Sequence, residues 1–150
     1  MRLGRPAGDI LDMPAAATAQ EMFEQVSQKL APRLKIEKPK LVRLFEKREN
    51  ESSTVIQPGL AIPHIVIEGK GMFDILPVRS REGIRFPGHD RLIRIAFVLV
   101  GSKDERNYHL RALMALANIV QEQDFTERWL DAQDNEGLRD IILLSKRARE

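Results

Sequence analysis

The sequence predicts an α/β domain in which a mixed β-sheet is flanked by helices. Two helical patterns come first, short β-branched strands follow them, and a further helix comes directly after the most apolar strand. Helices that alternate with strands in this way pack against the faces of the sheet. With 150 residues, of which 43% are hydrophobic and 31% charged, the chain has the size and composition of one folded domain.

Two helices are predicted in the first third of the chain. The first is expected over residues 18–31, because Thr18 and Glu21 have the spacing of a capping box and apolar residues recur after them at helical intervals. Pro39 fits the first turn of a second, strongly charged helix that ends near residues 49–50.

Short strands are predicted in the middle of the chain, where β-branched runs alternate with Pro and Gly. These runs cover residues 54–56, 60–62, 65–67, 72–78 and 92–100. The last run is apolar at nearly every position after Arg94, which is typical of a strand buried on both faces. We therefore expect it at the centre of the sheet.

Three helices are predicted after the central strand. The first ends at Gln121 and carries an apolar stripe that is expected to face the sheet. The stripe consists of Leu110, Leu113, Met114, Ala117 and Val120. Two closing helices are expected over residues 125–132 and 136–147, with Asp124 and Asn135 as their N-caps.

The composition narrows the chemistry that the chain can perform. It contains no cysteine, which excludes disulfides, thiolate-ligated metal sites and cysteine nucleophiles. A formal net charge of +2 does not require a nucleic-acid partner, and none is expected. Basic clusters at residues 79–81, 91–94 and 146–149 are interpreted as solvated faces.

Direct membrane insertion and export are not expected. The longest uncharged apolar run, residues 95–101, is seven residues long, whereas a helix that spans a bilayer needs about 20. The N-terminal residues lack the apolar core of a secretory signal. The expected location is therefore the cytoplasm.

The familiar cofactor and hydrolase motifs are absent. The sequence has no His-Glu-x-x-His pair, no phosphate-binding P-loop, no Gly-x-Gly-x-x-Gly and no Gly-x-Ser-x-Gly. We therefore expect neither a metal nor any other cofactor.

His64 is the main candidate for chemistry. It follows a proline at the end of a short apolar strand, and Arg48 precedes it by sixteen residues at a predicted helix end. A neutral imidazole can attack a phosphoryl group, a guanidinium can neutralise the phosphoryl charge, and a second imidazole can orient it. Arg48 and His109 are available for those two roles. The structural alternatives are an exposed His64, a helix-capping His109, and an Arg48 paired with Glu49 or Glu51.

The segment from Arg48 to His64 resembles the active-site segment of the fructose/mannitol-type enzyme IIA domains of the bacterial phosphotransferase system, a family that includes nitrogen-regulatory enzyme IIA-like proteins. Residues 92–101 and 108–117 resemble the central strand of that family and the helix that carries its second histidine. The resemblance implies the enzyme IIA (fructose/mannitol-type) fold, with a leader or linker over residues 1–12 and an enzyme IIA-like phosphotransfer domain over the remainder, residues 13–150.

The resemblance also implies a division of labour among the site residues. His64 would accept a phosphoryl group from the phosphohistidine of a histidine-containing phosphocarrier protein, and His109 would be the second active-site histidine. Arg48 would line the site and balance the phosphoryl charge, and Thr54 would contribute a hydroxyl near it. The activity implied is that of a phosphohistidine phosphotransferase component.

Three uses of such a domain remain open. The favoured one is regulation of a transporter or other partner, because bulky Ile65 follows the acceptor histidine where the family usually has a small residue. The short loop over residues 68–71 departs from the family in the same region. The alternatives are a sugar relay to a permease subunit and a binding module that is not phosphorylated. An unrelated anion- or nucleic-acid-binding domain would rest on the basic clusters alone.

Overall fold

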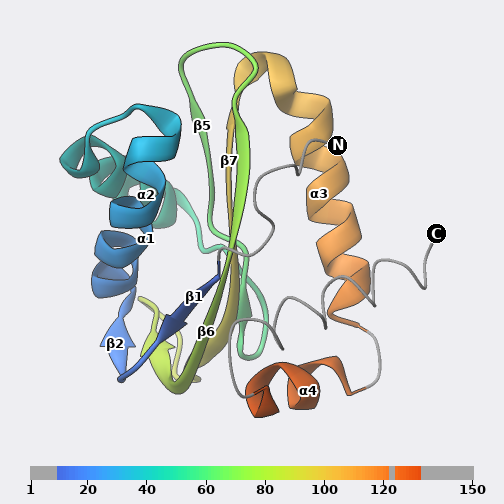
Figure 1. The fold of residues 1–150 in the computed structure, drawn as a ribbon. Helices are drawn as coiled ribbons and strands as arrows, with labels where there is room; N and C mark the ends of the chain where they lie inside the picture. The colour runs from blue at the N-terminus through green and yellow to red at the C-terminus, as the bar shows by residue number, and fades with distance from the viewer. Residues whose placement is uncertain (1–9, 122–123, 133–150) are drawn as a thin grey trace.

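A computed structural model describes residues 10–121 and 124–132, which form a mixed sheet with helices on both faces (Figure 1). The fold class predicted from the sequence is confirmed. The strands are β1 (Leu11–Met13), β2 (Ala17–Thr18), β3 (Val55–Gln57), β4 (Leu60–Ala61), β5 (His64–Ile67), β6 (Phe73–Arg85) and β7 (Ile93–Ser102). The helices are α1 (Ala19–Leu34), α2 (Lys38–Glu51), a 3₁₀ turn η1 (Lys103–Glu105), α3 (Arg106–Ile119) and α4 (Phe125–Asp131).

Strand β7 lies at the centre of the sheet, as the sequence predicts. The strand order is β1-β6-β7-β4-β3, and β5 continues alongside β7 beyond β4. β6 pairs with β7 in the antiparallel sense, whereas β4 and β5 pair with it in parallel. Successive side chains of β7 enter two different cores, since Ala96 packs on the side of α1 and α2 and Phe97 on the side of α3 and α4. This explains its continuous apolar run.

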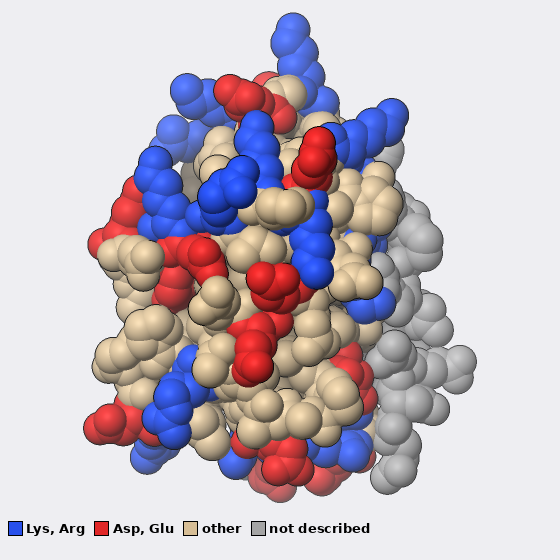
Figure 2. All heavy atoms as spheres, turned by 90° about the vertical axis from the view of Figure 1, so that its left-hand side faces the viewer, with Lys and Arg blue, Asp and Glu red and all other residues tan. Residues whose placement is uncertain are grey.

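Helices α1 and α2 form where the sequence predicts them, although α1 continues three residues past its expected end and includes Pro32. At the start of α1 the backbone N–H of Glu21 donates to Thr18 Oγ1 at 3.1 Å, and the backbone N–H of Thr18 donates to the Glu21 carboxylate at 2.8 Å. Pro39 lies in the first turn of α2, where its missing N–H costs no helical hydrogen bond. On the outward surface of this layer, Lys and Arg are interspersed with Asp and Glu and are densest in the upper half (Figure 2).

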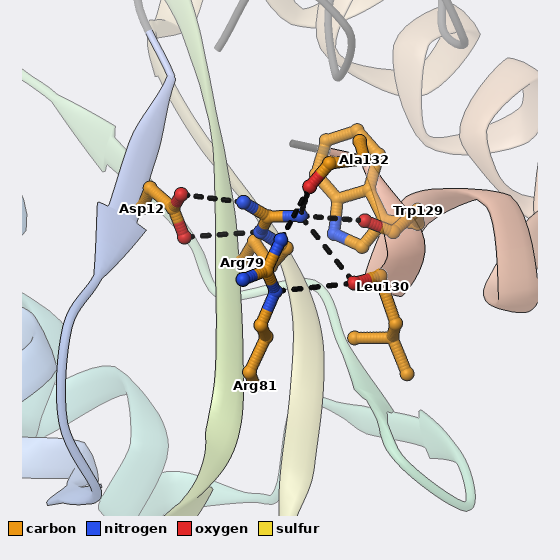
Figure 3. Close-up of polar contacts among 6 residues, drawn as sticks. All are labelled: Asp12, Arg79, Arg81, Trp129, Leu130 and Ala132. Atoms are coloured by element: carbon orange, nitrogen blue, oxygen red, sulfur yellow. Dashed lines mark hydrogen bonds and ion pairs between the residues drawn. The ribbon is translucent and has the colours of Figure 1, made fainter. Parts of the chain in front are cut away.

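Strand β6 is longer than predicted and continues through residues 79–81. Arg79 is only 1% exposed, so interpreting this cluster as a solvated face was wrong for that residue. Its guanidinium makes two bonds to Asp12 on β1, Nε to Oδ1 at 3.0 Å and Nη2 to Oδ2 at 2.5 Å. It also donates to the carbonyl oxygens of Trp129 and Ala132 at the end of α4 (Figure 3). Charge pairing and carbonyl acceptors make the burial of this cation possible.

Helix α3 buries only part of the stripe that was predicted to face the sheet: Val120 is buried and Leu113 packs against the core. Its buried residues are His109, Ala112, Leu116 and Ile119. Leu110 and Met114 of the predicted stripe are instead 46% and 69% exposed. Both sets have helical spacing, and Ala112 in the buried set lets the helix approach β7 closely.

The two ends of the described chain differ from expectation in detail. β1 crosses the predicted boundary between leader and domain, because Leu11 and Asp12 pair with β6 in the sheet. Helix α4 confirms the predicted 125–132 segment, although the Asp124 side chain makes no capping bond and pairs with Arg128 at 3.4 Å. The expected helix over residues 136–147 and its N-cap, Asn135, lie outside the described residues. Among the described helices, none combines the length and apolarity needed to cross a bilayer.

Candidate functional site

His64 is the first residue of β5, at the open edge of the sheet. It pairs in register with Leu99 of β7, and the backbone N–H of Leu99 donates to the Pro63 carbonyl at 2.9 Å. Side chains alternate along β5, so His64 and Val66 point outward while Ile65 enters the core between the sheet and α1 and α2. The bulk of Ile65 is therefore directed away from the imidazole, and it gives no support to an altered site.

The tautomer of His64 follows from its hydrogen bond. Its Nδ1 lies 2.7 Å from the carbonyl oxygen of Ile62. A carbonyl oxygen can only accept, so Nδ1 carries the hydrogen and Nε2 carries the lone pair. The hydrogen bond to the Ile62 carbonyl thus fixes the imidazole ring and leaves its nucleophilic nitrogen, Nε2, turned outward.

Arg48 reaches this nitrogen from the last turn of α2. Its Nη2 lies 3.4 Å from Nε2 of His64, and its Nη1 donates to the carbonyl oxygen of Ser52 at 2.8 Å and to Ser52 Oγ at 3.3 Å. The backbone after the helix therefore holds the guanidinium in place. A phosphoryl group on Nε2 would meet a positively charged, hydrogen-bonding neighbour.

His109 lies in the first turns of α3, with its ring close to that of His64. The ring centroids are 5.6 Å apart and the planes meet at 74°, edge to face. His109 is 7% exposed, and its pKa is lowered, first by burial and second by the nearby His64 imidazole. A neutral His109 at physiological pH can serve as a hydrogen-bond donor or acceptor without charge.

Close packing of α3 on β7 makes this pair possible. At Gly101 of β7, an added Cβ would lie 3.3 Å from Nδ1 of His109 and 3.3 Å from the ring of Phe73. Phe73 in turn lies 6.2 Å from the His109 ring, centroid to centroid. Glycine therefore leaves the space into which the second imidazole fits. No motif in the sequence marks Gly101 or Phe73 for this role.

Thr54 is held by a residue that the sequence did not single out for the site. Glu49, only 9% exposed, accepts the Thr54 hydroxyl at 2.6 Å and its backbone N–H at 2.9 Å. This pair fixes the turn that follows α2 and that supplies the Ser52 carbonyl to Arg48. A contribution of the Thr54 hydroxyl to phosphoryl binding stays a prediction. Glu49 follows Leu41 and Phe45 at helical spacing on the buried face of α2, and this spacing is the signal that could have found it.

The third histidine lies away from this pair. The backbone N–H of His89 donates to the Phe86 carbonyl at 3.3 Å, as expected of a turn residue, and its Nε2 lies 2.8 Å from Ser53 Oγ. Within residues 10–121 and 124–132, no group of three or more His, Asp and Glu side chains has the arrangement of a metal site.

Comparison with known proteins identifies the family of the chain. The family described as "Phosphoenolpyruvate-dependent sugar phosphotransferase system, EIIA 2" matches residues 7–144. The chain belongs to this enzyme IIA family. It is 29% identical over 96 residues to the fructose-specific EIIABC component of Bacillus subtilis, covering 63% of this chain and 15% of that protein. It is 27% identical over 96 residues to the fructose-specific EIIA component of Haloferax volcanii, covering 63% and 62% of the two chains.

Solved structures of enzyme IIA proteins share the fold. The nitrogen regulatory protein IIA-Ntr of Neisseria meningitidis has a TM-score of 0.81 and 23% identity, covering 91% of this chain and 93% of that one. IIA mannitol of Escherichia coli has a TM-score of 0.74 and 21% identity, covering 91% and 96%. The same E. coli protein has been solved in complex with phosphorylated enzyme IIB mannitol. The chain spans less than two thirds of the B. subtilis and H. volcanii relatives.

Proposed function

We propose that this enzyme IIA domain accepts a phosphoryl group on Nε2 of His64 from the phosphohistidine of a phosphocarrier protein, and that the phosphorylated domain regulates a transporter or another partner. The observation that carries the proposal is the bond between His64 Nδ1 and the Ile62 carbonyl, because it leaves the lone pair on the outward nitrogen. Family membership supports the reaction class.

The transfer exchanges one P–N bond for another. The bond between phosphorus and the donor imidazole breaks, that imidazole keeps the electron pair, and Nε2 of His64 supplies the pair for the new bond. Nδ1 of His64 keeps its proton throughout, so positive charge develops on the ring and is stabilised by the Ile62 carbonyl. Arg48, 3.4 Å from Nε2, neutralises the arriving phosphoryl oxygens. Both partners are imidazoles, so positioning and electrostatics supply most of the catalysis.

The surface around the site suits a protein donor. Val66 on the same side of β5 as His64 is 59% exposed, and Tyr108 and Leu110 beside His109 are 41% and 46% exposed. Exposed apolar side chains grouped around one site are typical of a protein-binding surface. The partner that we propose is the phosphocarrier protein.

A sugar relay is the second candidate. It is favoured by the fructose- and mannitol-specific names of relatives that are 27–30% identical to this chain over the aligned residues. Because Ile65 packs into the core, it no longer favours regulation over relay, and the short loop over residues 68–71 is the departure from the family that still supports regulation. Transfer from the phosphorylated domain to a purified enzyme IIB domain separates the two uses: rapid transfer indicates relay, and stable phosphorylation in its presence indicates regulation.

Phosphorylation itself is tested with phosphoenolpyruvate, enzyme I and the phosphocarrier protein, followed by intact mass at neutral to alkaline pH. We expect one phosphoryl increment in the wild-type chain and in His89→Ala, and none in His64→Ala. The donor is checked on a known acceptor in the same mixture. With an active donor, an unmodified wild-type chain would refute the proposal and indicate a binding module.

A further inference from the structure

The end of the molecule opposite His64 contains a cavity of about 300 Å³. Three separate segments line it: the β3–β4 hairpin, the start of β7, and the region of α3 and α4. Ile95 at the cavity precedes Leu99, the register partner of His64, by four residues. At ~3.4 Å per residue along a strand, Ile95 and Leu99 are roughly 14 Å apart along β7.

The lining of the cavity is apolar on one side and cationic on the other. Leu60, Ile95 and Leu130 contribute apolar surface, while Arg91 and Arg94 contribute guanidinium groups. No acidic side chain of the described residues lines it. Neither arginine forms an ion pair within the described part of the chain. The arginines of the basic cluster at residues 91–94 are thus exposed to solvent, as predicted, and also line the cavity.

We infer that this cavity binds a small organic anion, a carboxylate or phosphate carried on an apolar body. At the ~30 Å³ that a water molecule occupies in the liquid, its volume corresponds to about ten waters, which is the size of a small organic molecule. Arg91 and Arg94, which form no ion pair with another described residue, favour an acidic head, since arginine forms bidentate bonds with carboxylates and phosphates. The leucine and isoleucine surface favours an apolar body, because its burial removes apolar area from water.

Hydrogen bonds between the lining segments and their neighbours hold the walls of the cavity. The Leu130 carbonyl accepts Arg81 Nε at 3.2 Å, and the backbone N–H groups of Arg94 and Ile95 both donate to the Gly59 carbonyl, at 3.0 and 3.2 Å. The cavity is therefore formed before a ligand arrives, and binding does not require the order of these segments to change. This inference is independent of phosphorylation at His64.

The test uses ¹⁵N-labelled protein titrated with phenyl phosphate and followed by two-dimensional NMR. We expect the largest shifts at the amides of Leu60, Leu92 and Thr126. Inorganic phosphate tests the head alone and benzyl alcohol the apolar body alone, and each should bind at least about tenfold more weakly than phenyl phosphate.

Three variants make the result specific. The double variant Arg91→Gln/Arg94→Gln should weaken phenyl phosphate about tenfold or more and leave benzyl alcohol unchanged. Thr126→Trp, at an exposed position of α4, should fill the cavity and weaken both compounds. Arg111→Gln removes an exposed arginine on α3 and should change neither.

Several outcomes would overturn the inference. Shifts confined to residues around His64 and Arg48 would indicate that phenyl phosphate occupies the phosphoryl site instead. Equal affinity for inorganic phosphate would remove the apolar body from the ligand class. Unchanged binding in Thr126→Trp, with resonances elsewhere at their wild-type positions, would show that the cavity is not the site.

Discussion

Replacing Asp12 by asparagine removes the only carboxylate that the described structure gives to Arg79. The guanidinium is 1% exposed and would keep the carbonyl oxygens of Trp129 and Ala132, but it would lose its counter-charge. Breaking a fully buried ion pair costs about 3–5 kcal/mol. Asp12 is 34% exposed, so water already screens part of the attraction, and charge-assisted bonds of this kind contribute about 1.5–3 kcal/mol. We expect a loss of about 2–3 kcal/mol in the free energy of unfolding.

Urea unfolding measures this loss through the fluorescence of Trp129, which is the single tryptophan and is fully buried. For a chain of this length the expected decrease corresponds to about 5–10 °C in Tm. Asp131→Asn, at an exposed position on α4, is the matched control and should change stability by less than ~0.5 kcal/mol. A loss in Asp12→Asn as small as in this control would mean that carbonyl oxygens alone satisfy the guanidinium, and the argument from charge pairing would be refuted.

Three further predictions concern the site. Arg48→Ala should slow phosphorylation of His64 about a hundredfold, because it removes a hydrogen-bond donor to the phosphoryl group, and Arg48→Lys should recover part of the rate. Quenched-flow mass analysis measures these rates. An unchanged rate in Arg48→Ala would show that Arg48 has no part in the reaction. Thr54→Val should destabilise the fold by about 1–3 kcal/mol in urea, because Glu49 loses a buried donor; a fall in phosphorylation rate without that loss would favour a direct role for the hydroxyl. The lowered pKa of His109 sets the sign of the pH dependence of stability. The imidazole takes up a proton near pH 6.5 in the unfolded chain and only at lower pH in the folded chain. The free energy of unfolding therefore falls as the pH drops from about 6.5 through the folded pKa. His109→Gln should flatten that dependence in urea unfolding between pH 5 and 8, and an identical slope in both chains would contradict it.

The elements that the sequence predicts correctly are those with local causes. The capping box of Thr18 and Glu21 needs only four consecutive residues, and β7 carries its two-sided burial in its own apolar run. His64 and Arg48 could be proposed together because the resemblance to the enzyme IIA family spans the sixteen residues between them. Their contact is then a consequence of how α2 ends and β5 begins.

Features that depend on distant partners could not be predicted in this way. Arg79 reaches Asp12 across 67 positions and Trp129 across 50, so no window around Arg79 distinguishes it from a solvated arginine. The orientation of α3 also depends on tertiary packing, because Met114 and Leu116 both belong to stripes of helical period. Only the approach of the helix to β7 selects between them.

Substitution of Gly101 offers a way to change the position of His109 relative to His64. A methyl group there would press on His109 at 3.3 Å while leaving the chemical identity of both imidazoles intact. Alanine and then serine at residue 101 would therefore displace the His109 ring by increasing amounts. Phosphorylation rates measured across that series would separate what His109 contributes by proximity from what it contributes by its chemistry. Glycine at residue 101 is the reference from which both contributions are measured.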